Sequence, residues 1–183
     1  RALEKRDVID RMRRHRAEND KLHMVEKDAL WAVHRAERDD LYYRAKEASQ
    51  IALQHVRDRF KGRWRDLCQA QSVEWEHVER IQTSPLERAV YIVVNSERLG
   101  NGRPLTMREK TALVASPAKL FKAVERLHTR ERRGMAQVEK VEIKERLDRV
   151  WRAHDVSFAN LKAEQDAARA KLRAEQQAHN KRS

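Results

Sequence analysis

Residues 84–117 decide the fold, because this stretch carries most of the helix-breaking signals in the chain: SPLERAVYIVVNSERLGNGRPLTMREKTALVASP. All three prolines and two of the four glycines of the 183 residues lie in it. Ser84-Pro85-Leu86-Glu87 combines an N-cap serine, a proline at the first helical position and a glutamate at the third, which is typical of a helix start. Thr106-Met107-Arg108-Glu109 is a second capping box, and Ser116-Pro117 is a third start. Gly100 to Pro104 predicts a loop between the helix that starts at Ser84 and the helix that starts at Thr106.

The two flanking segments, residues 1–83 and 118–183, contain no proline and one glycine each. A composition rich in Arg, Lys, Glu, Ala and Leu indicates long helices. We therefore expect an all-α fold, a long antiparallel helical hairpin or coiled coil, with residues 84–117 as a small helical turn domain at its tip. Residues equally distant from residue 100 should then lie level with each other. Whether the arms pair within one chain or between two chains stays open.

Apolar residues at steps of three and four predict the packed face of each arm. In the first arm they are Leu22, Val25, Ala29, Val33, Ala36, Tyr43, Ala48 and Ile51. In the second arm a seam over residues 147–172 alternates steps of four and three, the period of a coiled coil: Leu147, Trp151, His154, Phe158, Leu161, Gln165, Ala168 and Leu172. Leu120, Val124 and Leu127 do not join this seam in register, so a change of winding is expected near residues 135–145.

Gly62, within RFKGRWRDL at residues 59–67, costs a helix about 1 kcal/mol against alanine. It allows a bulky group or a backbone to approach closely, permits a bend, or is simply tolerated in a solvated turn. Level pairing places it opposite Gly134 to Val138. Phe60 and Trp64 share a face, and we expect Trp64 to be a core residue.

The net charge of +12, from 41 Lys and Arg against 29 Asp and Glu, favours a polyanionic partner. Level pairing brings two cation groups of the opposite arms together and predicts a patch that binds phosphates without reading bases. A third group lies near the N-terminus, where its members spread around the helix. The predicted nucleic-acid-binding residues are Lys61, Arg63, Arg65, Arg130, Arg132, Arg133, Arg11, Arg13 and Arg14. The alternative is that these cations are solvated or paired with neighbouring carboxylates.

The sequence predicts no catalytic residue, no metal site and no cofactor. The loop at Gly100 lacks the lysine and hydroxyl of a phosphate-binding Walker loop, and Cys68 stands alone without a base partner. No run of 18 apolar residues is present, so we expect no membrane span. The lone cysteine fits a reducing, cytoplasmic setting. The start at Arg1, without Met or a signal-like segment, indicates a piece of a longer protein.

The order of short motifs along the chain resembles the C-terminal helical region of conjugative relaxases, the mobilisation nucleases of alphaproteobacterial plasmids and integrative elements. The motifs are His34 to Leu41, Phe60-Lys61, Trp64, Leu67, Gln71, Glu74, Ser84-Pro85-Leu86, Ser116-Pro117, Glu131-Arg132, Glu142-Ile143 and an Ala-Glu-Gln-rich last helix. The resemblance implies DNA contact, or recognition by a type IV secretion machinery during transfer. The family's His-x-His metal motif is absent, and Tyr42-Tyr43 is expected to be a helix-face pair with one ring packed.

Three functions are compatible with these patterns. The first is a non-catalytic helical domain of a DNA-mobilising protein that binds the phosphate backbone, with DNA and RNA not distinguished. The second is a protein-protein module, a spacer, a dimeriser or a docking signal for a secretion coupling partner, in which Val90, Val93 and Val94 contact the partner. The third is a coiled coil without a ligand, which leaves the arginine groups unexplained. A second copy of the chain is a further candidate partner.

Overall fold

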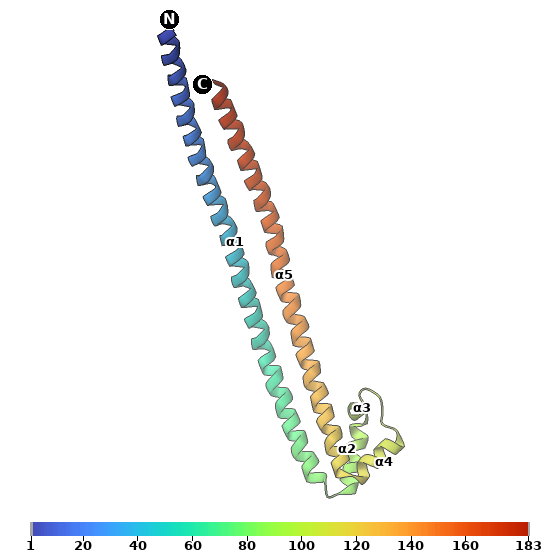
Figure 1. The fold of residues 1–183 in the computed structure, drawn as a ribbon. Helices are drawn as coiled ribbons and strands as arrows, with labels where there is room; N and C mark the ends of the chain where they lie inside the picture. The colour runs from blue at the N-terminus through green and yellow to red at the C-terminus, as the bar shows by residue number, and fades with distance from the viewer. Residues whose placement is uncertain (1, 183) are drawn as a thin grey trace. The chain divides into compact units, whose positions relative to one another are not determined.

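The structure is a computed structural model that describes the backbone of residues 2–182 and the side chains of residues 6–180. Arg1 and Ser183, the outer ends of the two predicted arms, lie outside the described residues. Over the described range every regular element is a helix, and the predicted all-α class is confirmed (Figure 1). The helices are α1 (Ala2–Ile81), α2 (Pro85–Val94), α3 (Ser96–Leu99), α4 (Met107–Ala115) and α5 (Pro117–Arg182).

The three predicted helix starts are confirmed by their capping hydrogen bonds. The Ser84 hydroxyl accepts from the Glu87 backbone N–H at 3.3 Å at the start of α2. Thr106 and Glu109 form the reciprocal capping box of α4. At the start of α5 the Ser116 hydroxyl accepts from the backbone N–H of Lys119 at 3.3 Å. Each cap satisfies a backbone donor that has no partner within its own helix.

The chain forms two compact units, which are described separately. The first combines residues 1–50 and 147–183, and the second contains residues 51–146. In the first unit Gln165 of α5 donates to the His34 backbone carbonyl at 3.0 Å, and Gln176 donates to that of His23 at 3.3 Å. These partners show that α1 and α5 run antiparallel there and that residues equally distant from residue 100 lie level, as predicted.

In the second unit the same antiparallel pairing joins the later part of α1 to the earlier part of α5. Trp64 Nε1 donates to Glu139 Oε2 at 2.8 Å, and Arg59 forms an ion pair with Glu142. Trp64 is half-buried at this helix contact. The unit's apolar core joins α1, α2, α3 and α5 and consists of Val78, Ile81, Tyr91, Ile92, Leu99, Leu120, Val124 and Leu127. The short helices therefore share one core with both long helices.

Three glutamines hold α1 and α5 together by the same contact. Each side-chain amide donates to the backbone carbonyl of a histidine on the opposite helix. The same amide also donates to the carboxylate of the glutamate that follows this histidine by three residues. The sets are Gln71 with His128 and Glu131, Gln165 with His34 and Glu37, and Gln176 with His23 and Glu26. We call this contact the glutamine clamp. Because one donor group serves two acceptors of one helix turn, the clamp fixes the register of the pair.

The predicted packed face of the first arm is wrong. All eight apolar residues of that face, from Leu22 to Ile51, are exposed. The α1 positions that α5 covers are instead centred on His34 and Ala45, which are buried, and His23, which is half-buried. These positions recur every eleven residues, as do Gln165 and Gln176 opposite them. A repeat of eleven residues gives about 3.67 residues per turn, more than the 3.5 of a heptad coiled coil.

The predicted seam of α5 holds in part. Gln165 is buried and Leu161 and Leu172 are half-buried, whereas Phe158 is exposed. The Tyr42 ring lies 5.9 Å from the Trp151 ring, while Tyr43 is exposed, so one ring of the pair contacts α5. The seam thus contains polar and aromatic contacts in place of a continuous apolar stripe.

Gly62 does not serve a close approach. A Cβ at Gly62 would meet no atom within 4 Å, and the same is true of Gly134. Helix α1 continues through Gly62 without interruption. The interpretation that a bulky group or a backbone approaches this glycine is therefore wrong, and Gly62 is tolerated on a half-exposed surface.

Candidate functional site

Glu74 of α1 is the centre of a polar network in the second unit. Its carboxylate accepts from the Tyr91 hydroxyl of α2 at 2.6 Å and from the Arg98 guanidinium of α3 at 3.0 and 3.2 Å. His128 Nε2 of α5 lies 2.8 Å from Glu74 Oε2. One carboxylate therefore connects four helices, and the tyrosine and histidine that contact it are buried.

Arg98 extends this network to α5. Its second contact is Glu131 Oε1 at 2.8 Å, and Glu131 Oε2 accepts from Gln71 Nε2 at 3.0 Å. Gln71 Oε1 in turn accepts from Arg132 Nε at 2.7 Å. The glutamine clamp formed by Gln71 is thus one branch of the network around Glu74.

The charges of this network are mutually stabilised. Burial alone would raise the pKa of Glu74, but hydrogen bonds from Tyr91, His128 and Arg98 and the Arg98 charge outweigh it and hold the pKa below 4.5. Burial and the bond to Glu74 raise the pKa of the Tyr91 hydroxyl. Burial would lower the pKa of Arg98, yet its bonds to Glu131 and Glu74 raise it. The network thereby positions the short helices.

Arg88 fixes α2 from the same side. Its Nε donates to the Val114 carbonyl of α4 at 3.0 Å, and its guanidinium also donates to the Gln82 carbonyl that follows α1. The side chain is buried together with Tyr91 and Ile92. Hydrophobic periodicity does not predict the contacts of Arg88, Tyr91 and Arg98, because a pattern of apolar residues carries no information on buried polar groups. The break between α2 and α3 at Asn95 was not anticipated either.

The opposite face of α2 is apolar and exposed. Leu86 and Val94 are 75% and 77% exposed, and the predicted partner-binding residues Val90 and Val93 lie between them on the helix with about 60% exposure each. Their spacing places them on successive turns of one face. We call Leu86, Val90, Val93 and Val94 the α2 apolar face.

Two of the predicted nucleic-acid-binding cations contribute to folding. Arg130 donates to the Arg98 carbonyl of α3 at 2.9 Å and to that of Leu99 at 3.4 Å. Arg132 donates to Gln71, as described above. Arg130 therefore holds the end of α3, and Arg132 supports the glutamine clamp formed by Gln71.

The other four predicted cations of the second unit are exposed. Arg63 covers the Phe60 ring, with its guanidinium carbon 5.0 Å from the ring centroid. Lys61, Arg65 and Arg133 have no ion pair among the described residues. The predicted convergent patch is therefore divided between two arginines with intramolecular partners and four exposed cations.

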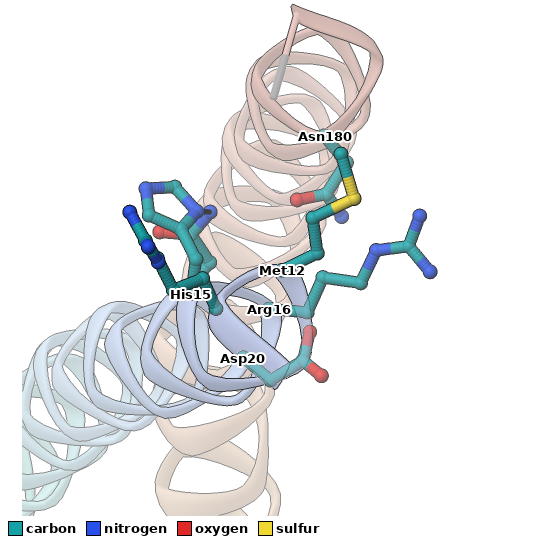
Figure 2. A pocket seen from close by; sticks show the side chains of 7 residues that line it. Met12, His15, Arg16, Asp20 and Asn180 are labelled. Carbon is teal, nitrogen blue, oxygen red and sulfur yellow. Dashed lines mark hydrogen bonds between the residues drawn. The ribbon is translucent and has the colours of Figure 1, made fainter. Parts of the chain in front are cut away.

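Arg11, Arg13 and Arg14 are exposed on α1 in the first unit, and Arg13 lies 3.9 Å from Asp10. Arg11, but neither Arg13 nor Arg14, lines an open groove of about 770 Å³. Figure 2 shows Met12 turned toward Asn180 of α5, with Arg16 and Asp20 on one side. The groove is lined by Arg11, Met12, His15, Arg16, Asn19, Asp20 and Asn180. Its charge is mixed, because a carboxylate accompanies the two arginines.

Among the described residues, no three His, Cys, Asp or Glu side chains are grouped so as to hold a metal ion. Cys68 is a free, exposed thiol. Within the same residues, none of the helices combines the length and the apolar character that a membrane crossing requires. Comparison with protein-family models, with curated proteins and with solved structures finds no match to this chain.

Proposed function

We propose that this protein is a non-catalytic helical interaction module that binds a protein partner through the α2 apolar face. The observation that carries the proposal is the exposure of four large apolar side chains on one helix face. A contiguous exposed apolar surface of this kind is characteristic of protein-protein contacts. Arg88 and Tyr91 hold α2 from its other side, so the face is presented on a fixed helix.

Rigid presentation lowers the entropic cost of binding, since fewer side chains and backbone angles are ordered on association. The face contains no charged side chain, and a partner that matches it needs an apolar groove or the apolar side of an amphipathic helix. The resemblance to relaxases suggests a coupling protein of a type IV secretion system as the first purified partner to test. Conjugative mobilisation in the cytoplasm is the corresponding biological setting.

Val93→Asp tests the proposal, with Val73→Asp as a matched control. Both valines are 60% exposed and both lie on helices of the second unit, but Val73 lies on α1 outside the α2 apolar face. We expect Val93→Asp to weaken binding to the purified partner at least tenfold, about 1.4 kcal/mol, and Val73→Asp to change it less than twofold. Equal binding by Val93→Asp and the unchanged protein would refute the role of α2.

A second function, binding of a nucleic-acid backbone, is supported by the exposed cations Lys61, Arg65 and Arg133 and by the net charge of +12. Phosphate binding of this kind weakens steeply as salt increases, because counterions are released on association. Fluorescence anisotropy with a labelled duplex and a labelled single strand should show an affinity that falls between about 50 and 200 mM salt. Absence of binding to both at the lower concentration would exclude this function.

We also infer that residues 84–117 act as the small tip domain of a helical hairpin. The shared core and the Glu74 network support this organisation, since both join α2 and α3 to the end of α1 and the start of α5. A tip built in this way presents the α2 apolar face away from the contacts that hold the helix.

A further inference from the structure

A second exposed apolar surface lies on α1 in the first unit and is separate from the α2 apolar face. Between residues 22 and 36 it follows the helix at steps of three and four, as a packing face does, and the exposed Asp39 interrupts it before Tyr43. We call these residues the α1 stripe: Leu22, Val25, Ala29, Ala32, Val33, Ala36 and Tyr43, all exposed.

The α1 stripe is not the surface that α5 uses. Helix α5 packs on the side of α1 that carries His23, His34 and Ala45. At 3.6 residues per turn, the stripe is rotated about 150° from that side around the helix axis. One face of α1 therefore has its helix partner, and the other presents large apolar side chains with none among the described residues.

We propose that the α1 stripe pairs with the α1 stripe of a second copy of this chain, with the two helices parallel and in register. Charge at the edges of the stripe selects this partner. In a parallel pair, Lys21 of one copy lies beside Glu26 of the second copy, and Arg35 lies beside Asp40 of the second copy. These are opposite charges at both positions, and the symmetry of the pair forms each contact twice.

The carboxylates at these edges have an oxygen for the new contact. Glu26 uses Oε2 to accept from Gln176, and Asp40 uses Oδ2 for its 2.7 Å ion pair with Arg44. Their other oxygens, Oε1 and Oδ1, are available to a cation of the second copy.

An antiparallel pair of the same stripes is disfavoured by charge. Antiparallel helices place equivalent edges against each other, so the edge that carries Glu26, Asp40 and Glu47 would face its own copy. Three carboxylates would then meet three carboxylates without a cation from the opposite edge. The same sequence therefore selects the parallel orientation.

The alanines at positions 29, 32 and 36 give the stripe a narrow centre that lets two helices approach closely, while Leu22, Val25 and Val33 supply the larger buried surface. A face with only four larger apolar side chains among its seven residues predicts a dimer that dissociates on dilution. The expected species is a reversible dimer of twice the 21.7 kDa chain mass.

Sedimentation equilibrium of the purified chain over a range of concentrations measures this dimer. Val25→Glu places a carboxylate in the stripe, and we expect it to raise the dissociation constant at least tenfold. Val156→Glu is the matched control, because Val25 and Val156 are 65% and 64% exposed in the same unit and Val156 lies on α5. It should change the constant less than twofold. A monomer at all concentrations, or equal dissociation by both variants, would overturn the proposal.

Disulfide formation determines the orientation. In a Cys68→Ser background, Val25→Cys and Tyr43→Cys proteins are mixed and oxidised, each carrying a different mass tag. A parallel pair in register gives only products that join Val25→Cys to itself or Tyr43→Cys to itself. Predominant joining of one variant to the other, or equally efficient joining of a Val156→Cys control, would overturn the parallel arrangement. The α2 face takes no part in either experiment, so these outcomes are independent of the proposed function.

Discussion

Replacement of Glu74 by alanine should release the short helices from the second unit. The carboxylate is the common acceptor for Tyr91, Arg98 and His128, and of these three groups only Arg98 keeps a second carboxylate, that of Glu131. Glu76→Ala is the matched control, because Glu76 lies two residues later on α1, is exposed and makes the same change of residue type. Helix propensity then cancels between the two variants.

The expected loss follows from burial. Hydrogen bonds to a charged group contribute about 1.5–3 kcal/mol, and a buried partner left unsatisfied costs about 1–3 kcal/mol. Tyr91 and His128 are buried and lose their acceptor, whereas Arg98 is half-exposed and can be hydrated. Because the three contacts share one carboxylate and are not additive, we expect Glu74→Ala to lower the free energy of unfolding by about 3 kcal/mol. Glu76→Ala should change it by less than about 0.5 kcal/mol.

Urea denaturation followed by circular dichroism measures this difference, and hydrogen exchange of the α2 amides locates it. We expect the exchange of residues 85–94 to accelerate in Glu74→Ala and to stay unchanged in Glu76→Ala. If the two variants differ by less than about 0.5 kcal/mol and α2 exchanges at the same rate in both, the network does not hold the short helices.

The pH dependence of the free energy of unfolding tests the same network, and its direction follows from the pKa of Glu74. The folded protein holds the pKa of Glu74 below its unfolded value of 4.5. A carboxyl group of this kind stabilises the fold fully above pH 4.5, and its contribution is lost as the pH falls through the lower, folded pKa. The stability difference between the unchanged protein and Glu74→Ala should therefore be largest near neutral pH and shrink on acidification below pH 4.5.

Further predictions concern the glycines and the clamps. Gly62→Ala and Gly134→Ala should each raise the free energy of unfolding by about 0.5–1 kcal/mol, since both sites are helical with open space around the Cβ position. Gly100→Ala should lower it, because the new methyl group would clash with the Arg103 backbone carbonyl. Gln165→Ala should destabilise the first unit by about 1–3 kcal/mol, whereas replacement of the exposed Gln177 of the same helix by alanine should be neutral. Thermal unfolding of all five variants, followed by circular dichroism, measures these effects.

Local signals in the sequence predicted the three capped helix starts and the antiparallel level pairing of the long helices, but not the break between α2 and α3. The caps at Ser84, Thr106 and Ser116 mark the helix starts because each satisfies its own helix terminus, without help from distant residues. Level pairing follows from chain geometry once the turn region is known. These features depend on residues close in sequence, and the structure confirms them.

The packed face of α1 could not be found from apolar periodicity, because the contact with α5 is largely polar. His23 and His34 contribute backbone carbonyls to glutamine amides, and a hydrophobic pattern gives no weight to such groups. The signal that would have identified the contact is the repeated Ala-Glu-Gln at residues 163–165 and 174–176, eleven residues apart like the two histidines. The apolar stripe that periodicity did select is present, but it faces away from α5.

The proposed α1 stripe and the cations Arg11, Arg13 and Arg14 predicted to bind nucleic acid lie on the same helix of the first unit and are linked through charge. A parallel dimer places Arg11, Arg13 and Arg14 of both copies near each other, which opposes association at low salt and concentrates positive charge for a polyanion. Thermodynamic reciprocity then requires that an oligonucleotide bound across both copies strengthen the dimer by the factor by which the dimer strengthens its binding. If Val25→Glu leaves oligonucleotide affinity unchanged while abolishing the dimer, the nucleic acid contacts cations other than these three. The exposed Lys61, Arg65 and Arg133 of the second unit would then carry the binding.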